Sequence, residues 1–352
     1  MTTYYVGAGG NDGSAGTSWA TRKLTLNGAE DIPVAAGDTI YIGPGTYREL
    51  LTVDVSGSAG NPITYIGDYT GVNTDKVGGV VRITGSADDI ALTRTNCVTA
   101  TSKNYRTFQG FLMDGCSSHL ISLITSCGNW IVNQCYLHTY GNTVCINVAG
   151  TGTTNTVQNS ILSSASNILV FTHTSVVDNA AHLVQNCIFI GGTAQIAFVR
   201  VGGATVKNCS FLYRATNGVQ IQTALSVGQT ETVNNCLFMG LSTAMTGITV
   251  GEITENYNNI IGCITARTNT NTGANSLAYF TMFDPRWAFE MMFDNKKQST
   301  PFDFMLDSPL INVAGTSPTT TDLRNSAVVG AQREWGALEY NADVQSGIIR
   351  QA

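Results

Sequence analysis

Short apolar runs rich in β-branched residues alternate with polar positions through most of the chain. One phrase recurs at residues 183–189 (Leu-Val-Gln-Asn-Cys-Ile-Phe), 205–211 (Thr-Val-Lys-Asn-Cys-Ser-Phe) and 232–238 (Thr-Val-Asn-Asn-Cys-Leu-Phe). Its cysteines are 22 residues apart (187 to 209) and then 27 residues apart (209 to 236). Self-similarity at such a spacing is typical of stacked structural repeats.

Weaker copies extend the repeat in both directions, at residues 108–113, 131–137, 156–162 and 257–261. A second apolar alternation lies between the copies, at residues 121–125, 144–148, 168–172, 196–200 and 219–223. Runs with a period of two that are broken by Gly, Asn, Ser and Thr predict strands. Each repeat therefore holds two or three strands, and it has no segment of helix length.

Strands that repeat in one direction at this length predict an all-β fold, a right-handed parallel β-helix of roughly nine to eleven coils. We expect a single domain over residues 1–352. Residues 1–50 would form an N-terminal cap and first coil, with a short helix in 20–30, and residues 51–277 the regular coils. Residues 278–352 would form a C-terminal capping segment. Its aromatic-rich part, 278–306, would cover the coil stack or, alternatively, dock another chain.

The asparagines of the phrase predict a stacked ladder. Asn tolerates the left-handed backbone of a sharp corner, and its amide can hydrogen-bond to the equivalent amide one coil away, at about 4.8 Å. The expected ladder consists of Asn159, Asn186, Asn208, Asn235 and Asn259.

Composition narrows the possible partners. Charged residues make up 12% of the chain, the net charge is −6, and Lys and Arg do not cluster, so nucleic acid is not an expected partner. No apolar segment of about 18 residues and no secretory signal is present, so we expect neither a membrane span nor export by that route. The predicted location is a virion assembled in the host cytoplasm.

Cysteine usage does not indicate a metal or a disulfide framework. Nine cysteines cannot all pair within one chain, and those of the repeated phrase are expected to pack as small buried hydrophobes. No Cys-x-x-Cys or His-x-x-x-His pair supports zinc. We predict no metal and no cofactor.

Three blocks resemble a known family. Residues 37–47 (Gly-Asp-Thr-Ile-Tyr-Ile-Gly-Pro-Gly-Thr-Tyr) and 60–66 (Gly-Asn-Pro-Ile-Thr-Tyr-Ile) resemble the opening of the right-handed parallel β-helix proteins of the pectin-lyase-like superfamily. Residues 335–340 (Trp-Gly-Ala-Leu-Glu-Tyr) resemble their closing segment. The resemblance covers nearly the whole chain and implies the fold, but a fold does not define a function.

Lyases and hydrolases on this fold resemble one another in placing acidic clusters on one outer face. Between residues 101 and 250 the only acidic residues are Asp114, Asp178 and Glu231, which lie coils apart. One group could still converge, because Asp114, His138 and Ser163 occupy equivalent positions in successive coils. Asp88 and Asp89 lie about one coil earlier.

This group is the only catalytic candidate, with Asp88, Asp89, Asp114 and His138 as its members. The alternative, which we favour, is a polar patch at the start of a solvated turn. A catalytic triad also needs a hydrogen-bonded relay and an oxyanion hole, and stacking supplies neither.

Several apolar residues are expected on outward phases and would form a subunit interface, since a soluble monomer rarely exposes such a patch. Alternatively, the 278–306 segment covers them. They are Ile124, Leu169, Phe171, Ile188, Ile190, Val199, Leu237 and Met239.

Sparse acids, low charge and these apolar positions favour a non-enzymatic structural protein of a tailed bacteriophage. We expect a β-helical head-decoration or short-spike subunit, forming a homotrimer and contacting other virion proteins such as the major capsid protein. Two alternatives are a polysaccharide lyase or glycosidase that acts on a bacterial surface glycan, and a non-catalytic glycan-binding or adhesion module.

Overall fold

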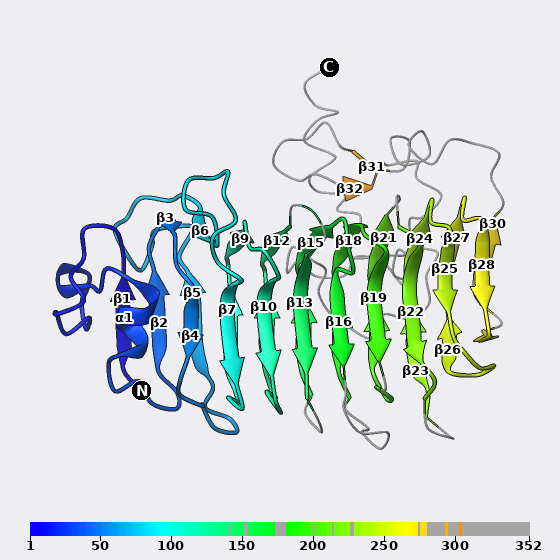
Figure 1. The fold of residues 1–352 in the computed structure, drawn as a ribbon, viewed down its shortest axis with the longest axis horizontal. Coiled ribbons are helices and arrows are strands. Elements are labelled where there is room, and N and C mark those ends of the chain that lie inside the picture. Colours follow the sequence, from blue (N-terminus) through cyan, green and yellow to red (C-terminus); the bar gives the residue numbers. More distant parts are fainter. Residues whose placement is uncertain are drawn as a thin grey trace, which may run out of the picture.

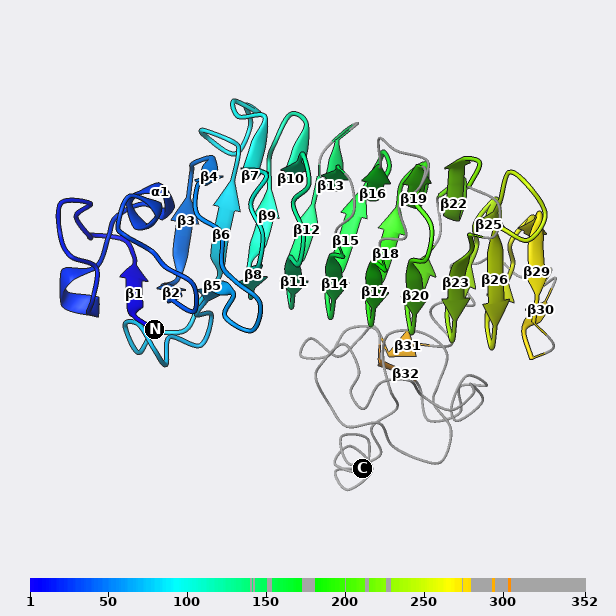
Figure 2. The same ribbon diagram turned by 90° about the horizontal axis from the view of Figure 1, so that it is seen from below.

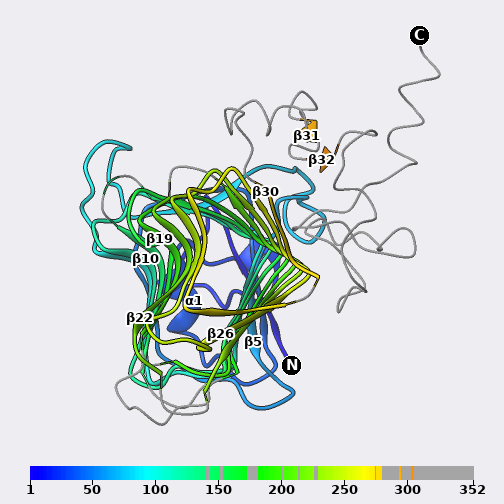
Figure 3. The same ribbon diagram turned by 90° about the vertical axis from the view of Figure 1, so that its right-hand side faces the viewer.

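Three long parallel sheets wind around a common axis in the computed structural model (Figures 1 and 3). The structure describes residues 1–139, 141, 143–150, 154–172, 181–199, 201–212, 215–225, 229–273, 275–279, 293–294 and 303–304. Within these residues the sheets contain eleven, ten and nine strands, here named sheets A, B and C. The predicted all-β parallel β-helix is confirmed.

From β2 onward, the strands follow the order A, B, C along the chain, and β1 pairs with β2 at the N-terminal edge of sheet A. Sheet A contains β1 (Thr3–Val6), β2 (Thr39–Ile42), β5 (Ile63–Gly67), β8 (Arg106–Gln109), β11 (Ile131–Asn133), β14 (Thr156–Gln158), β17 (Leu183–Gln185), β20 (Thr205–Lys207), β23 (Glu231–Asn234), β26 (Ile253–Asn256) and β29 (Thr270–Thr272).

Sheet B contains β3 (Gly45–Tyr47), β6 (Val81–Thr84), β9 (Leu112–Asp114), β12 (Tyr136–His138), β15 (Ile161–Ser164), β18 (Ile188–Gly191), β21 (Ser210–Leu212), β24 (Leu237–Met239), β27 (Asn259–Ile261) and β30 (Leu277–Tyr279). Sheet C contains β4 (Leu51–Val53), β7 (Asn96–Thr101), β10 (His119–Ile124), β13 (Val144–Ala149), β16 (Leu169–Thr172), β19 (Ala194–Val199), β22 (Asn217–Thr223), β25 (Thr243–Thr246) and β28 (Thr265–Thr268). A separate antiparallel pair is formed by β31 (Phe293–Asp294) and β32 (Asp303–Phe304).

The corner between sheets A and B is the same in every repeat. Asn159, Asn186, Asn208 and Asn235 all occupy it with φ between +50° and +54°, in the left-handed region. Each backbone N–H there donates to a carbonyl of the following coil, over 3.1–3.2 Å. The amide of Asn186 also donates to Oδ1 of Asn159 (3.1 Å). The corner therefore links neighbouring coils through both backbone and side chain.

The fifth residue predicted for the ladder, Asn259, does not lie at the corner. Asn256 lies opposite Asn234, so the corner residue of that coil is Tyr257, and Asn259 lies opposite Leu237, at the start of β27. Asn258 takes the place of the repeated cysteine, and its Oδ1 accepts from the N–H of Cys236 (2.9 Å). The sequence therefore predicted this corner two residues too far along the chain, because the copy at 257–261 contains two consecutive asparagines.

The interior of the solenoid is filled by stacked side chains from equivalent positions. Tyr65, Phe108 and Trp130 stack almost coplanar, with ring centroids 4.9 and 5.5 Å apart. Phe189, Phe211 and Phe238 form a second stack, with centroids 5.0 and 4.5 Å apart. The coil spacing matches the spacing of stacked rings, so one register satisfies both the ladder hydrogen bonds and the aromatic packing.

Five of the eight residues expected at an exposed interface are buried. Leu169 and Phe171 belong to the core, because β16 begins one residue later than the alternation suggested and Ile168 lies in the preceding corner. Ile188, Leu237 and Met239 lie outside the main core cluster, yet at most 2% of each is exposed.

The remaining three positions are more accessible. Ile190 and Val199 are partly buried, and Ile124 is 41% exposed. The continuous exposed apolar patch that the sequence suggested is therefore absent from the described part of the chain. The predicted covering segment, 278–352, lies outside the described residues apart from 278–279, 293–294 and 303–304.

A short helix, α1 (Leu26–Glu30), lies at the N-terminal end of the coils, after the 3-10 turn η1 (Trp19–Thr21) (Figures 1 and 2). The side chain of Thr25 caps α1 by accepting from the N–H of Gly28. Glu30 makes two hydrogen bonds to the guanidinium of Arg106 (2.8 and 3.1 Å), and Tyr65 donates to the same carboxylate. This buried ion pair fixes the cap to the coil that begins with β8. No helix in the described chain is long and apolar enough to cross a membrane.

Substitution at the corner separates backbone conformation from side-chain bonding. We expect Asn186→Ala to lower the free energy of unfolding by about 2–3 kcal/mol, because Ala combines left-handed strain with the loss of an amide hydrogen bond. Asn186→Gly removes only the hydrogen bond and is expected to cost about 1 kcal/mol. Urea unfolding followed by circular dichroism measures both, and equal losses for the two variants would contradict the corner argument.

Candidate functional site

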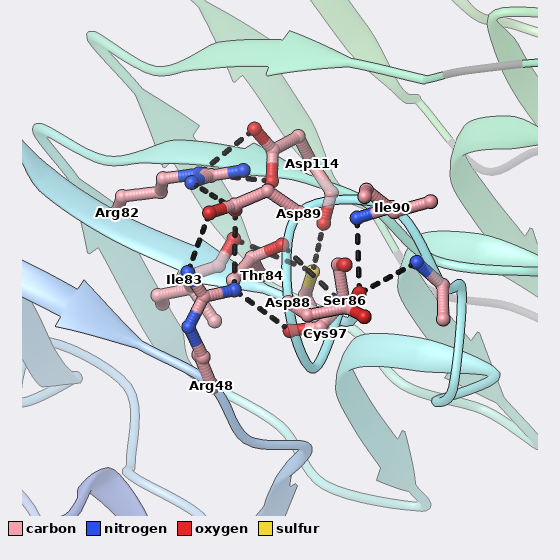
Figure 4. Close-up of polar contacts among 11 residues, drawn as sticks. Arg48, Arg82, Ile83, Thr84, Ser86, Asp88, Asp89, Ile90, Cys97 and Asp114 are labelled. Atoms are coloured by element: carbon pink, nitrogen blue, oxygen red, sulfur yellow. Dashed lines mark hydrogen bonds and ion pairs between the residues drawn. The ribbon is translucent and has the colours of Figure 1, made fainter.

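A network of charged side chains lies on the outer surface near the N-terminal end of sheet B. Arg82 lies on β6 and Asp114 on the neighbouring strand β9, while Arg48 follows β3. Asp89 comes from the loop of residues 85–95, which joins β6 to β7 and folds back over these strands (Figure 4). We call these four residues the Arg–Asp network.

The Arg–Asp network forms a continuous chain of ion pairs. Nε of Arg82 donates to both carboxylate oxygens of Asp114 (3.1 and 2.9 Å), and its Nη1 donates to Asp89 (2.6 Å). Arg48 donates to Asp89 through both terminal nitrogens (3.1 and 2.6 Å). Asp114 is buried, whereas 48% of the Asp89 side chain is exposed. One end of the network is therefore fixed in the wall, and the other faces solvent.

The loop acids are ionised at neutral pH. Hydrogen bonds from Arg48 and then Arg82 lower the pKa of Asp89 to about 2. The N–H groups of Ala91 and Ile90 donate to Oδ1 of Asp88 and lower its pKa, so Asp88 stabilises the turn. A glycosidase needs one carboxyl group that stays protonated as a general acid, and neither Asp88 nor Asp89 fits that role.

The predicted row of Asp114, His138 and Ser163 exists, because these residues occupy equivalent positions of β9, β12 and β15. His138 lies opposite Ser163 in the ladder and follows Leu137, which lies opposite Met113. The carboxylate of Asp114 is engaged by Arg82 rather than by the imidazole. The ring of His138 stacks on Tyr136, with centroids 6.3 Å apart. Stacking of coils brings the three side chains into line, whereas the ion pair determines what Asp114 binds.

Tyr136 extends the site along sheet B. It occupies the same outward row as Arg82, with Leu112 on the strand between them, so the two backbones are separated by about 10 Å. Tyr136 is 43% exposed, and an accessible aromatic ring is a platform on which the apolar face of a sugar ring can pack. Charged hydrogen-bonding groups and an aromatic ring thus share one outer face.

Sequence reasoning missed the two arginines, and they are the residues that organise the site. Arg82 is the single charge within the run Val-Val-Arg-Ile-Thr, at an outward position of a strand, and this signal was readable. The position of Arg48 beside Asp89 depends on a loop whose course no periodicity specifies. Among the described residues, no three His, Cys, Asp or Glu side chains converge as a metal site requires.

Comparison with known proteins supports the fold. No protein-family model matches the sequence, and a search of curated proteins found no match. Pectate lyase Pel9A is similar in structure, with a TM-score of 0.54, 15% sequence identity and coverage of 97% of each chain. XylC in complex with xylose has a TM-score of 0.54 and 13% identity, over 77% of this chain and 70% of that protein. A rhamnogalacturonan lyase has a TM-score of 0.53 and 16% identity, over 74% of each chain. At such identities the likeness shows a pectate-lyase-like β-solenoid fold and no more.

One acid lies far from the Arg–Asp network and inside the solenoid. Glu231 opens β23, and its side chain is fully buried. Neither of its carboxyl oxygens makes a hydrogen bond of ordinary length and angle, although the backbone of Ala204 lies near. Burial raises the pKa of Glu231 well above its usual value. Glu231 is thus a protonated, neutral core residue rather than a site residue.

This burial predicts a pH-dependent stability. Below about pH 4.5 the carboxyl is protonated in both states, whereas above it the unfolded chain ionises and the folded chain does not. Stability therefore falls as pH rises from about 4.5 to the folded pKa, by up to about 1.4 kcal/mol per pH unit. Urea unfolding of the wild type and Glu231→Gln should give curves that diverge between pH 5 and 7, with the variant more stable at pH 7. Curves that stay parallel would show that Glu231 is ionised in the fold.

Proposed function

We propose that this protein binds a polysaccharide along the outer face of sheet B, at the Arg–Asp network and Tyr136, and that it does not cleave the bound glycan. The observation that carries the proposal is the side-by-side placement of paired Arg and Asp groups with an exposed tyrosine. Paired donors and acceptors suit the vicinal hydroxyls of a sugar, and the ring suits its apolar face.

Two further observations support binding. The solved structures with a similar fold include two polysaccharide lyases and a complex with xylose. The glycan class that we propose is a bacterial surface polysaccharide, either capsule or lipopolysaccharide. A separation of about 10 Å between the backbones of Arg82 and Tyr136 would accommodate roughly two sugar units.

Hydrolytic cleavage is the less favoured activity, because the three candidate acids do not supply the acid–base pair that it requires. Asp88 and Asp89 are held ionised, and the carboxylate of Asp114 forms an ion pair with Arg82. Acid–base hydrolysis needs two carboxyl groups with different protonation states.

Binding is tested with a panel of purified capsule and lipopolysaccharide glycans by calorimetry. Arg82→Met is expected to weaken binding at least about 10-fold, since hydrogen bonds to charged groups contribute about 1.5–3 kcal/mol. Tyr136→Ala is expected to weaken it about 3–10-fold through the loss of ring packing. The control is Lys103→Met, which changes a charge near the corner between sheets C and A. Binding that is unaffected by both site variants would contradict the proposed location.

The same samples are assayed for released reducing ends and unsaturated sugar products. We expect no release. Release by the wild type that is lost in a folded Asp114→Asn variant would overturn the non-catalytic conclusion and favour a lyase or glycosidase.

A bacteriophage structural role remains our second proposal. A rod-like coil stack with 12% charged residues suits a decoration or short-spike subunit that binds other virion proteins. The argument for a homotrimer is weakened, because Leu169, Phe171, Ile188, Leu237 and Met239 are buried within one chain. Only Ile124 among the eight is clearly exposed.

Sedimentation equilibrium of the isolated chain distinguishes these proposals. We expect a monomer at micromolar concentration, since five of the eight apolar positions that suggested an interface are buried. A stable trimer that Ile124→Asp dissociates would instead support the structural subunit.

A further inference from the structure

Two cysteines meet beneath the Arg–Asp network. Cys97 is the second residue of β7 in sheet C, and Cys116 follows β9 in the next coil, at the corner between sheets B and C. Their Sγ atoms are 2.9 Å apart, and both side chains are buried. The two residues thus come from successive coils, one from a strand and one from a corner, and their thiols face each other.

The surrounding backbone is fitted closely to this pair. Cys97 Sγ also lies 3.2 Å from the carbonyl of Asp114 and 3.5 Å from that of Ile83, the first of which appears in Figure 4. A Cβ atom on Gly85 would lie 2.6 Å from Sγ of Cys116, so only glycine leaves room for this sulfur. Neither sulfur can move away without disturbing the strands beside it.

We propose that Cys97 and Cys116 form a disulfide bond when the protein meets an oxidising environment. The covalent bond is about 2.05 Å long, so the two sulfurs need to approach by only about 1 Å. The bond would close a loop whose ends are 19 residues apart, and such a crosslink stabilises mainly by restricting the unfolded chain.

The oxidant is a small-molecule disulfide such as oxidised glutathione. One protein thiolate attacks it, forming a mixed disulfide and releasing one glutathione thiolate. The second protein thiol loses its proton and attacks the mixed disulfide, which releases the second glutathione. Two protein thiols are oxidised, one oxidised glutathione is reduced to two molecules of glutathione, and the two protons pass to the released thiolates.

Burial of the two thiols limits the rate at which the disulfide forms. The thiols are enclosed, and burial raises the pKa of Cys97 well above its usual value, so the thiolate is scarce in the closed fold. Reaction requires opening of the loop that joins β6 to β7, which makes it slow but selective for this pair. The reduced form is stable in a reducing cytoplasm, and the crosslinked form accumulates once the protein enters an oxidising environment.

The crosslink has a consequence that rests on the proposed function. Cys97 follows the loop that carries Asp89, and Cys116 follows Asp114 by two residues. A bond between them would hold the two acidic ends of the Arg–Asp network at a fixed separation. Preorganised groups bind a ligand more tightly because less freedom is lost on binding.

The test uses the full chain, incubated with oxidised glutathione and then alkylated in denaturant. Digestion with trypsin and chymotrypsin separates Cys97 (peptide 95–103) from Cys116 (peptide 113–120) for mass spectrometry without reductant. We expect these two peptides to be linked, and a melting temperature about 5 °C above that of the reduced sample. Cys236→Ala, a buried cysteine elsewhere, should keep the link and the shift, whereas Cys97→Ala should lose both.

Two results would overturn the proposal. One is alkylation of both Cys97 and Cys116 after prolonged oxidation of the wild type, and the other is linkage of either residue to a different cysteine. Both are read from the wild-type protein, so they do not depend on how the variants fold. They are also independent of any glycan measurement.

Discussion

The whole molecule depends on one backbone corner that is repeated from coil to coil. A residue in the left-handed conformation turns the chain from sheet A into sheet B, and its N–H binds the next coil. Because the corners are in phase, every strand meets its counterpart in register, and Phe, Tyr and Trp rings stack inside. A shift of one residue would turn each inward side chain outward and break the ladder and the stacks together. Local backbone geometry and long-range packing therefore enforce the same register.

The outer face has greater freedom, because its side chains are not needed to fill the core. At the N-terminal part of sheet B this freedom is used for charge. Arg82 holds Asp114 on one side and Asp89 on the other, so one guanidinium connects the strand wall with the loop. The same pairing that would offer donors and acceptors to the proposed glycan also keeps Asp89 ionised. A surface of this kind recognises hydroxyl groups well and transfers protons poorly.

Repetition explains what was predictable from the sequence. The strands and four of the five ladder asparagines follow from a phrase that recurs, since each copy supports the assignment of the others. Where a copy departs from the repeated phrase, the assignment of its residues is wrong. Asn259 was assigned to the corner although it lies two residues beyond it, because this copy has Tyr257 at the corner and two asparagines after it. Phe171 was assigned to the wrong face because the adjacent residues Ile168 and Leu169 are both in the core, which shifts the alternation by one residue. The Arg–Asp network includes a residue of a non-repeating loop, so the sequence suggested Asp89 and Asp114 but not their partners. Arg82 was readable as a lone charge on a strand, whereas the position of Arg48 beside Asp89 was not.

The N-terminal cap also limits how the rod can grow. A stack of parallel strands leaves unpaired backbone groups on its terminal coil, and such an edge can recruit a second copy. Here α1 lies across that end, and the buried Glu30–Arg106 pair fastens it to the coil behind. Removing the helix would leave the Arg106 guanidinium without its carboxylate and would uncover a strand edge of the kind that can pair with another chain. For a molecule made of nearly identical layers, a defined length is as much a property of its end as of its repeats.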